Sequence, residues 1–94
     1  FRTNCAAIVE NRDWTTAELK RLGFDVLPSM ANFVFAKHPA IPGGALYQEL
    51  RNRGVLVRHF SSPRLDDYNR ITIGSAEQMA EFIRILTEIL EETL

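Results

Sequence analysis

The C-terminal segment carries the clearest structural signal in this chain of 94 residues. Ser75 is followed three residues later by Gln78, the spacing of a capping box that satisfies backbone amides at the start of a helix. A helix with one apolar face has to pack against another element, so this segment predicts a helix that covers a sheet. The apolar residues behind the capping box recur at helical spacing and form one face: Met79, Phe82, Ile83, Leu86, Ile89 and Leu90.

The rest of the chain alternates helical and extended patterns. The first helical segment ends at Gly23 and the second at Gly54, and both glycines are typical helix stops. The order helix, strand, strand, helix, strand, strand, helix predicts an α+β fold, with a small, largely antiparallel sheet packed against helices. Helices are expected over residues 1–22, 45–53 and from 75 onward, and strands over residues 24–27, 32–36, 55–58 and 70–74.

Two arginines stand at the ends of two apolar runs. Arg58 ends the run of residues 55–57 and Arg70 begins the run of residues 71–74, with eleven residues between the two arginines. If the runs pair as antiparallel strands with Arg58 opposite Arg70, the apolar side chains share one face of the sheet and both guanidinium groups share the other. A guanidinium is a rigid fork of donors that matches carboxylate or phosphate oxygens, so we interpret Arg58 and Arg70 as substrate-binding residues that clamp an anion.

The opposing interpretation is that Arg58 and Arg70 pair with Asp66 and Asp67 on a solvated rim, and the spacing alone leaves both interpretations open. Adjacent carboxylates in a turn rarely converge on one substrate. We therefore expect Asp66 and Asp67 to form the turn and not to act as an acid and a base.

Length and composition indicate a single domain over residues 1–94, long enough to bury roughly two thirds of its unfolded surface. Eleven basic and twelve acidic residues give a net charge of −1, so we expect neither nucleic acid nor a membrane as a partner. The lone cysteine, Cys5, excludes an internal disulfide and suits the cytoplasm. Because the chain begins at Phe1 inside a helical pattern, we expect it to be a piece of a longer protein.

The remaining candidates for chemistry are weak. His38 and His59 have no second metal-binding residue at a ligand spacing, so we predict no metal site. For His59, next to Arg58 in the sequence, we predict a structural role, because neighbours in a strand point to opposite faces. Cys5, Phe33 and Phe35 are assigned to the core, and the Gly43-Gly44 pair to a flexible start of the second helix. Lys20 and Lys37 lack the buried setting of a reactive lysine, so we predict no catalytic residue in this chain.

Three segments together carry a family pattern. Residues 27–35 read Leu-Pro-Ser-Met-Ala-Asn-Phe-Val-Phe, residues 46–58 run from Leu-Tyr to Gly-Val-Leu-Val-Arg, and residues 70–74 read Arg-Ile-Thr-Ile-Gly. In this order they resemble the C-terminal small domain of histidinol-phosphate aminotransferases, over nearly the whole chain. The resemblance implies the small domain of a fold type I enzyme whose large, cofactor-binding domain lies outside these 94 residues.

The resemblance also implies a function. The whole enzyme would be a homodimer that uses pyridoxal phosphate to exchange an amino group between histidinol phosphate and 2-oxoglutarate in histidine biosynthesis. By position, Arg70 resembles the arginine that grips the carboxylate or phosphate of the substrate, and Arg58 resembles the second arginine that helps to hold the phosphate. The lysine that binds the cofactor belongs in this family to the large domain, so we expect this piece alone to hold no cofactor and to be inactive.

Two further readings of the pattern stay open. Within the same fold, a relative of threonine-phosphate decarboxylase or an aromatic aminotransferase would use the same two arginines. From a different class, a stand-alone α+β module would bind a regulatory ligand, or would bind RNA by stacking bases on Phe33 and Phe35. The net charge and the missing aromatic-glycine motif argue against RNA.

Overall fold

A computed structural model describes residues 2–28, 31–60 and 67–93 of the chain. Its elements follow the predicted order α-β-β-α-β-β-α, which confirms the α+β fold. None of the described helices combines the length and the apolar character that crossing a membrane requires. The elements are α1 (Arg2–Arg21), β1 (Asp25–Leu27), β2 (Phe33–Lys37), α2 (Gly43–Asn52), β3 (Arg58–His59), β4 (Asn69–Thr72) and α3 (Ala76–Thr93).

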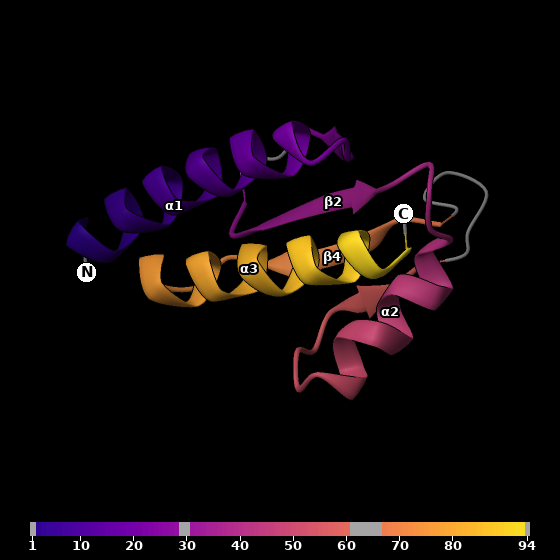
Figure 1. The fold of residues 1–94 in the computed structure, drawn as a ribbon. Coiled ribbons are helices and arrows are strands. Elements are labelled where there is room, and N and C mark those ends of the chain that lie inside the picture. Colours follow the sequence, from indigo (N-terminus) through magenta and orange to yellow (C-terminus); the bar gives the residue numbers. More distant parts are fainter. Residues whose placement is uncertain (1, 29–30, 61–66, 94) are drawn as a thin grey trace.

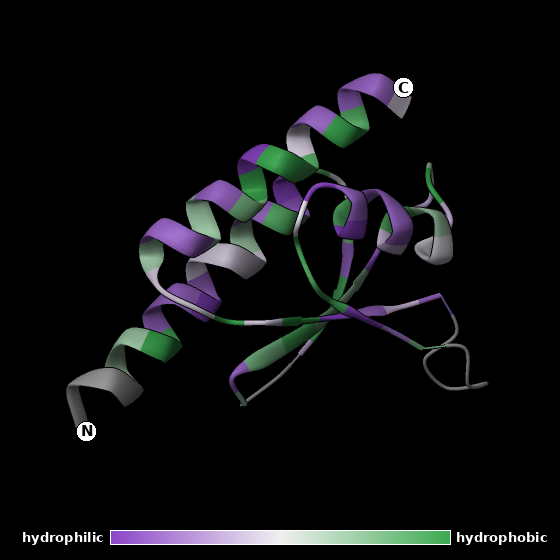
Figure 2. Cartoon of the chain, turned by 90° about the horizontal axis from the view of Figure 1, so that it is seen from below, coloured by the Kyte–Doolittle hydropathy of each residue, from purple (hydrophilic) through white to green (hydrophobic). Residues whose placement is uncertain are grey.

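The four strands form one antiparallel sheet in the order β1-β2-β4-β3. Because β4 is antiparallel to both β2 and β3, those two strands run in the same direction, and α2 is the crossover between them. Figure 1 shows α1 and α3 running alongside each other, with α2 near β3. The view in Figure 2 shows the helices gathered on one side of the sheet.

The core lies between the sheet and the helices. Val34 and Ala36 of β2, together with Ile71 of β4, turn their side chains into it and are at most 4% exposed. Leu46 and Leu50 of α2 are buried as predicted. All six residues of the predicted apolar face of α3 are also buried: Met79, Phe82, Ile83, Leu86, Ile89 and Leu90.

The ends of the helices are defined by the predicted residues. The amide of Ser75 donates to Oε1 of Gln78 over 2.9 Å, and the amide of Gln78 donates to Oγ of Ser75 over 3.1 Å, so the capping box is confirmed. Gly23 follows α1 with a φ of 96° and Gly54 follows α2 with a φ of 83°, left-handed conformations that favour glycine. Both predicted helix stops are therefore confirmed.

The assignment of Phe33 and Phe35 to the core is wrong. Both rings are half-buried on the face of the sheet that points away from the helices, while Val34 and Ala36 fill the core between them. A period of two separates the faces of a strand without saying which face turns inward. The smaller side chains of Val34 and Ala36 turn inward here and join the core, where α1 lies against β1 and β2. The expected core position of Cys5 concerns a side chain that the structure does not describe.

The third strand is shorter than residues 55–58, because only Arg58 and His59 pair with β4. Val55 and Val57 still turn toward the core and are partly buried against it, whereas Leu56 between them is 82% exposed. The predicted alternation of faces is thus confirmed, although residues 55–57 lie outside the strand.

Gly43 is more than a flexible start of α2. Its amide donates to Oδ1 of Asp67 over 2.6 Å, and its carbonyl accepts a 3.0 Å bond from Nδ2 of Asn69. A Cβ atom at Gly43 would clash with the backbone oxygen of Asp67, whereas one at Gly44 would meet Nε2 of His59 at 3.8 Å, an ordinary contact. Close approach of two backbones therefore requires glycine at the first of the two positions.

This difference gives a matched pair of variants. We expect Gly43→Ala to lower the free energy of unfolding by about 2 kcal/mol or more, because the segment at Asp67 has to move and its bonds weaken. Gly44→Ala should leave stability unchanged or raise it by up to about 1 kcal/mol, because alanine restricts the unfolded chain. Urea denaturation of both variants measures the difference, and equal losses would contradict the close approach.

Candidate anion-binding face

The face of the sheet that points away from the helices carries the arginine pair. The ladder sets Arg58 of β3 opposite Arg70 of β4, and Arg70 opposite Phe35 of β2. Leu27 of β1 completes this cross-strand row. The predicted register of the two arginines is therefore confirmed. Directly opposed positions have Cβ atoms roughly 5 Å apart, so two side chains of this length can reach one small anion.

Aromatic rings surround both guanidinium groups. Cζ of Arg70 lies 5.4 Å from the centroid of the Phe33 ring, and Cζ of Arg58 lies 5.7 Å from the centroid of the Phe60 ring. The Phe35 ring packs edge-to-face against both of these rings, at 5.4 Å from Phe33 and 5.5 Å from Phe60. The two cations thus rest on one continuous aromatic cluster.

Within the part of the chain that the structure describes, the charge of the two arginines is not compensated nearby. Among the residues that the structure describes, neither Arg58 nor Arg70 has a carboxylate within ion-pair distance. Nε of Arg70 is also buried, and it has no hydrogen-bond partner within the same residues. A buried donor without a partner costs free energy unless a ligand or another polypeptide supplies an acceptor. By contrast, carboxylates pair with four other arginines: Arg12, Arg21, Arg53 and Arg84.

The position of Asp67 tests the interpretation in which this carboxylate pairs with Arg58 or Arg70. Its carboxylate accepts the 2.6 Å bond from the amide of Gly43, at the start of α2, and it makes no ion pair with Arg58 or Arg70. Its φ of 68° is a turn conformation, so the expected role of Asp67 as a turn residue is confirmed. Asp66 lies outside the described residues.

Asn69 is a structural residue of the site that was not expected from the sequence. It is 1% exposed, its Nδ2 donates to the carbonyl of Gly43, and its Oδ1 lies 3.1 Å from Nδ1 of His59. This chain of bonds ties β3, β4 and the start of α2 together next to the two arginines in the sequence. The structural role predicted for His59 is confirmed. An asparagine beside a strand-forming run is unusual and was the available signal.

His38 also has a structural role. Its Nδ1 accepts a 3.0 Å bond from the amide of Ala40, so Nε2 carries the proton and donates to the carbonyl of Leu22 over 2.9 Å. The ring is 9% exposed and packs edge-to-face on Phe24. Both ring nitrogens are thus satisfied within the fold.

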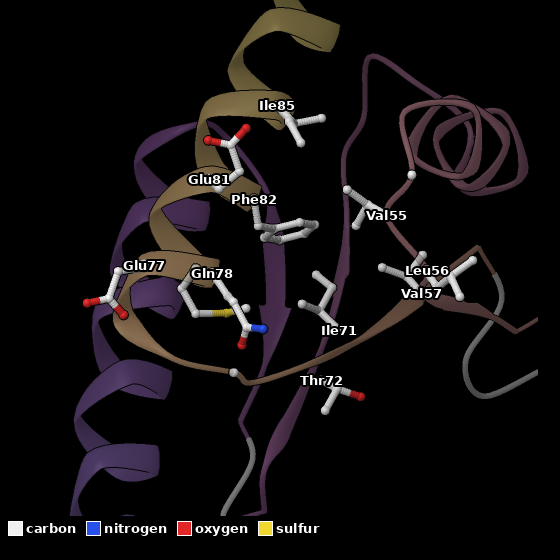
Figure 3. A pocket seen from close by; sticks show the side chains of 13 residues that line it. Val55, Leu56, Val57, Ile71, Thr72, Glu77, Gln78, Glu81, Phe82 and Ile85 are labelled. Atoms are coloured by element: carbon white, nitrogen blue, oxygen red, sulfur yellow. The ribbon is translucent and has the colours of Figure 1, made fainter.

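An apolar groove lies on the helix side of the sheet. It encloses about 550 Å³ and lies beside the segment 55–57. Figure 3 shows Ile71, Phe82 and Ile85 directed into the space between this segment and α3. Glu77 and Glu81 stand on its wall, and neither arginine of the pair lines it. The groove is therefore unsuited to an anion, and the arginine face is the better candidate site.

Comparison with known proteins assigns the chain to a family. Residues 1–86 match the sequence profile of aminotransferase class I and II. The chain belongs to the class I and II aminotransferase family. Its relatives and the solved structures with the same fold agree with the resemblance drawn from residues 27–35, 46–58 and 70–74.

One relative and two solved structures show how similar this chain is to known proteins. Histidinol-phosphate aminotransferase 1 of Bradyrhizobium diazoefficiens is 52% identical over 90 residues, which are 96% of this chain and 26% of the relative. The histidinol-phosphate aminotransferase of Clostridium acetobutylicum has a TM-score of 0.84 at 25% identity, over 93% of this chain and 27% of that chain. The L-threonine-O-3-phosphate decarboxylase of Porphyromonas gingivalis has a TM-score of 0.73 at 32% identity, over 86% of this chain and 26% of that chain. The chain spans about a quarter of the length of each.

Tyr68 leads into β4 and anchors the end of this aminotransferase sheet. Its ring is 7% exposed and lies beneath Lys37, whose Nζ is 4.8 Å from the ring centroid. Its hydroxyl donates a 2.9 Å bond to Oδ2 of Asp25 on β1. Burial, and then this bond to a carboxylate, raise the pKa of the Tyr68 phenol above its usual 10.0.

A raised pKa in the folded state means that folding favours the neutral phenol. The contribution of Tyr68 to stability is therefore fully present below pH 10 and is lost as the pH rises through the higher pKa of the folded state. We expect urea denaturation at a series of alkaline pH values to show this decline, and Tyr68→Phe to flatten it while costing about 1 kcal/mol at neutral pH through the lost bond. An identical alkaline decline in both proteins would contradict the assignment.

Proposed function

We propose that this chain is the C-terminal small domain of a homodimeric, cytoplasmic aminotransferase that depends on pyridoxal phosphate and acts on histidinol phosphate and 2-oxoglutarate. Support comes from the aminotransferase family of the chain and from a histidinol-phosphate aminotransferase that is 52% identical to it. The observation that carries the assignment is Arg58 opposite Arg70, two cations on one face of the sheet that pair with no carboxylate among the described residues. Imidazole acetol phosphate and glutamate would be the products.

The two arginines would divide the work of binding the substrates. Arg70 is half-buried in the central strand β4, so it would be the fixed anchor for the anion that every substrate of the reaction carries. Arg58 is exposed on the edge strand β3 and would supply the second fork for a phosphate. A phosphate has more oxygens and more charge than a carboxylate, so it gains more from two guanidinium groups. Fixing this distal anion would orient the amine for reaction.

The cofactor would be held by the rest of the enzyme. Pyridoxal phosphate, when bound, withdraws electrons from the carbon that carries the substrate amine. In this chain Lys20 is exposed on α1 and Lys37 lies over the ring of Tyr68, so neither has the buried setting of a reactive lysine. The chain alone is accordingly proposed to lack a cofactor site and activity, and to contribute the substrate arginines to the complete enzyme.

A second candidate is an enzyme of the threonine-phosphate decarboxylase type. The observation that favours it is the structural likeness to the decarboxylase of Porphyromonas gingivalis, with 32% identity. An anion clamp on its own does not distinguish the group attached to the phosphate. The purified full-length enzyme separates the two, because only an aminotransferase transfers the amine of histidinol phosphate to 2-oxoglutarate, whereas a decarboxylase releases carbon dioxide from threonine phosphate. The same assay with phenylalanine tests an aromatic aminotransferase.

Alanine variants of the arginines in the full-length enzyme test the clamp. We expect Arg70→Ala to lower kcat/KM for both histidinol phosphate and glutamate by about 10- to 100-fold, the loss of one or two charge-assisted hydrogen bonds. Arg58→Ala should lower kcat/KM for histidinol phosphate by a similar factor and for glutamate much less. Steady-state kinetics of the two half-reactions measure both effects.

Arg51→Ala is the matched control, because Arg51 is an exposed arginine in the last turn of α2 and its loss changes the net charge equally. This control should change kcat/KM less than about twofold, in line with the small effect of an exposed charge. Unchanged kinetics of Arg70→Ala would overturn the proposed site. Equal losses with both substrates for Arg58→Ala would overturn the division of labour.

A further inference from the structure

The partners of the two guanidinium groups are aromatic rings. Cζ of Arg70 lies over Phe33 at 5.4 Å and Cζ of Arg58 lies over Phe60 at 5.7 Å, whereas no carboxylate of the described residues pairs with either arginine. We propose that Phe33 and Phe60 are positioning residues, which hold the two guanidinium groups in place for the substrate anion. This inference rests on the proposed function of the arginine pair.

An aromatic ring suits this task better than a carboxylate does. A carboxylate that held Arg70 would occupy its N–H donors and neutralise its charge, and the substrate would have to displace it. A ring attracts the cation through its negative face. It does not use the N–H donors of the guanidinium, because these donors point outward in the plane of the guanidinium itself. The partnerless Nε of Arg70 agrees with this arrangement, since the side chain is held while a donor stays unused within the described residues.

The rings are themselves fixed by the backbone of the sheet. Phe33 is paired with Thr72 of β4, and the amide of Phe60 donates a 3.0 Å bond to the carbonyl of Tyr68. Phe35 packs edge-to-face against both Phe33 and Phe60, so the rings form one cluster beneath both cations. Edge-to-face packing restricts ring motion and adds stability beyond the buried area. The cluster thereby couples the orientations of the two arginines.

Leucine variants in the full-length enzyme test the proposal. We expect Phe33→Leu to raise the KM for histidinol phosphate about 5- to 10-fold, the size of a cation–π contact, with kcat changed less than about twofold. Phe33→Tyr retains the ring face and should restore KM to within about twofold of the parent enzyme. Phe60→Leu should raise the KM for histidinol phosphate more than the KM for glutamate, because it acts through Arg58.

Phe24→Leu is the matched control for the loss of a buried ring. Phe24 is 5% exposed in the core, and its ring packs on His38 and not on an arginine. This variant should lower the Tm and leave KM unchanged. If Phe24→Leu and Phe33→Leu raise KM equally, the effect is one of general stability and the positioning role is overturned.

A double-variant cycle separates this inference from the proposed function. If Phe33 acts through Arg70, Phe33→Leu should add no further increase in KM when Arg70 is already alanine. An equal increase in both backgrounds would overturn the positioning role while leaving the anion clamp intact, and so would an unchanged KM in Phe33→Leu beside a raised KM in Arg70→Ala. If Arg70→Ala itself leaves KM unchanged, the proposed function fails and the inference fails with it.

Discussion

The antiparallel pairing of β4 with both β2 and β3 is the constraint on which the rest of the structure depends. Because β4 is the inner strand, its register fixes the faces of its two neighbours at once. Ile71 then turns to the helices, whereas Arg70 turns to the opposite face beside Arg58 and Phe35. A shift of β4 by one residue would bury the guanidinium group of Arg70 and expose Ile71, at a cost of several kcal/mol for the buried charge. The core therefore selects the register that assembles the arginine pair.

Two layers of interactions keep this pair in place. On the helix side, Asn69 bonds both His59 and Gly43, which joins the edge strand, the inner strand and the start of α2 in one network. On the opposite side, the aromatic cluster lies beneath the cations. This surface holds two guanidinium groups against aromatic rings, and none of the described carboxylates pairs with either of them. Such a surface is complementary to a small anionic metabolite.

Much of this arrangement follows from the sequence, and the remainder has definite physical causes. The apolar period and capping box of α3, and the alternation that puts Arg58 and Arg70 on the same face once their strands pair, are local patterns that periodicity resolves. The same alternation does not tell which face of β2 is inward, so Phe33 was wrongly assigned to the core. The requirement for glycine at Gly43 depends on Asp67, which lies 24 residues away in the chain. Contacts of that kind arise only from the tertiary fold.

The most direct test is a crystal structure of the full-length enzyme with histidinol phosphate bound. The account predicts that the phosphate oxygens lie within hydrogen-bond distance of the guanidinium groups of both Arg58 and Arg70, with each group still over its ring. A phosphate bound elsewhere, or carboxylates from the rest of the enzyme paired with these two arginines in the ligand-bound state, would contradict it.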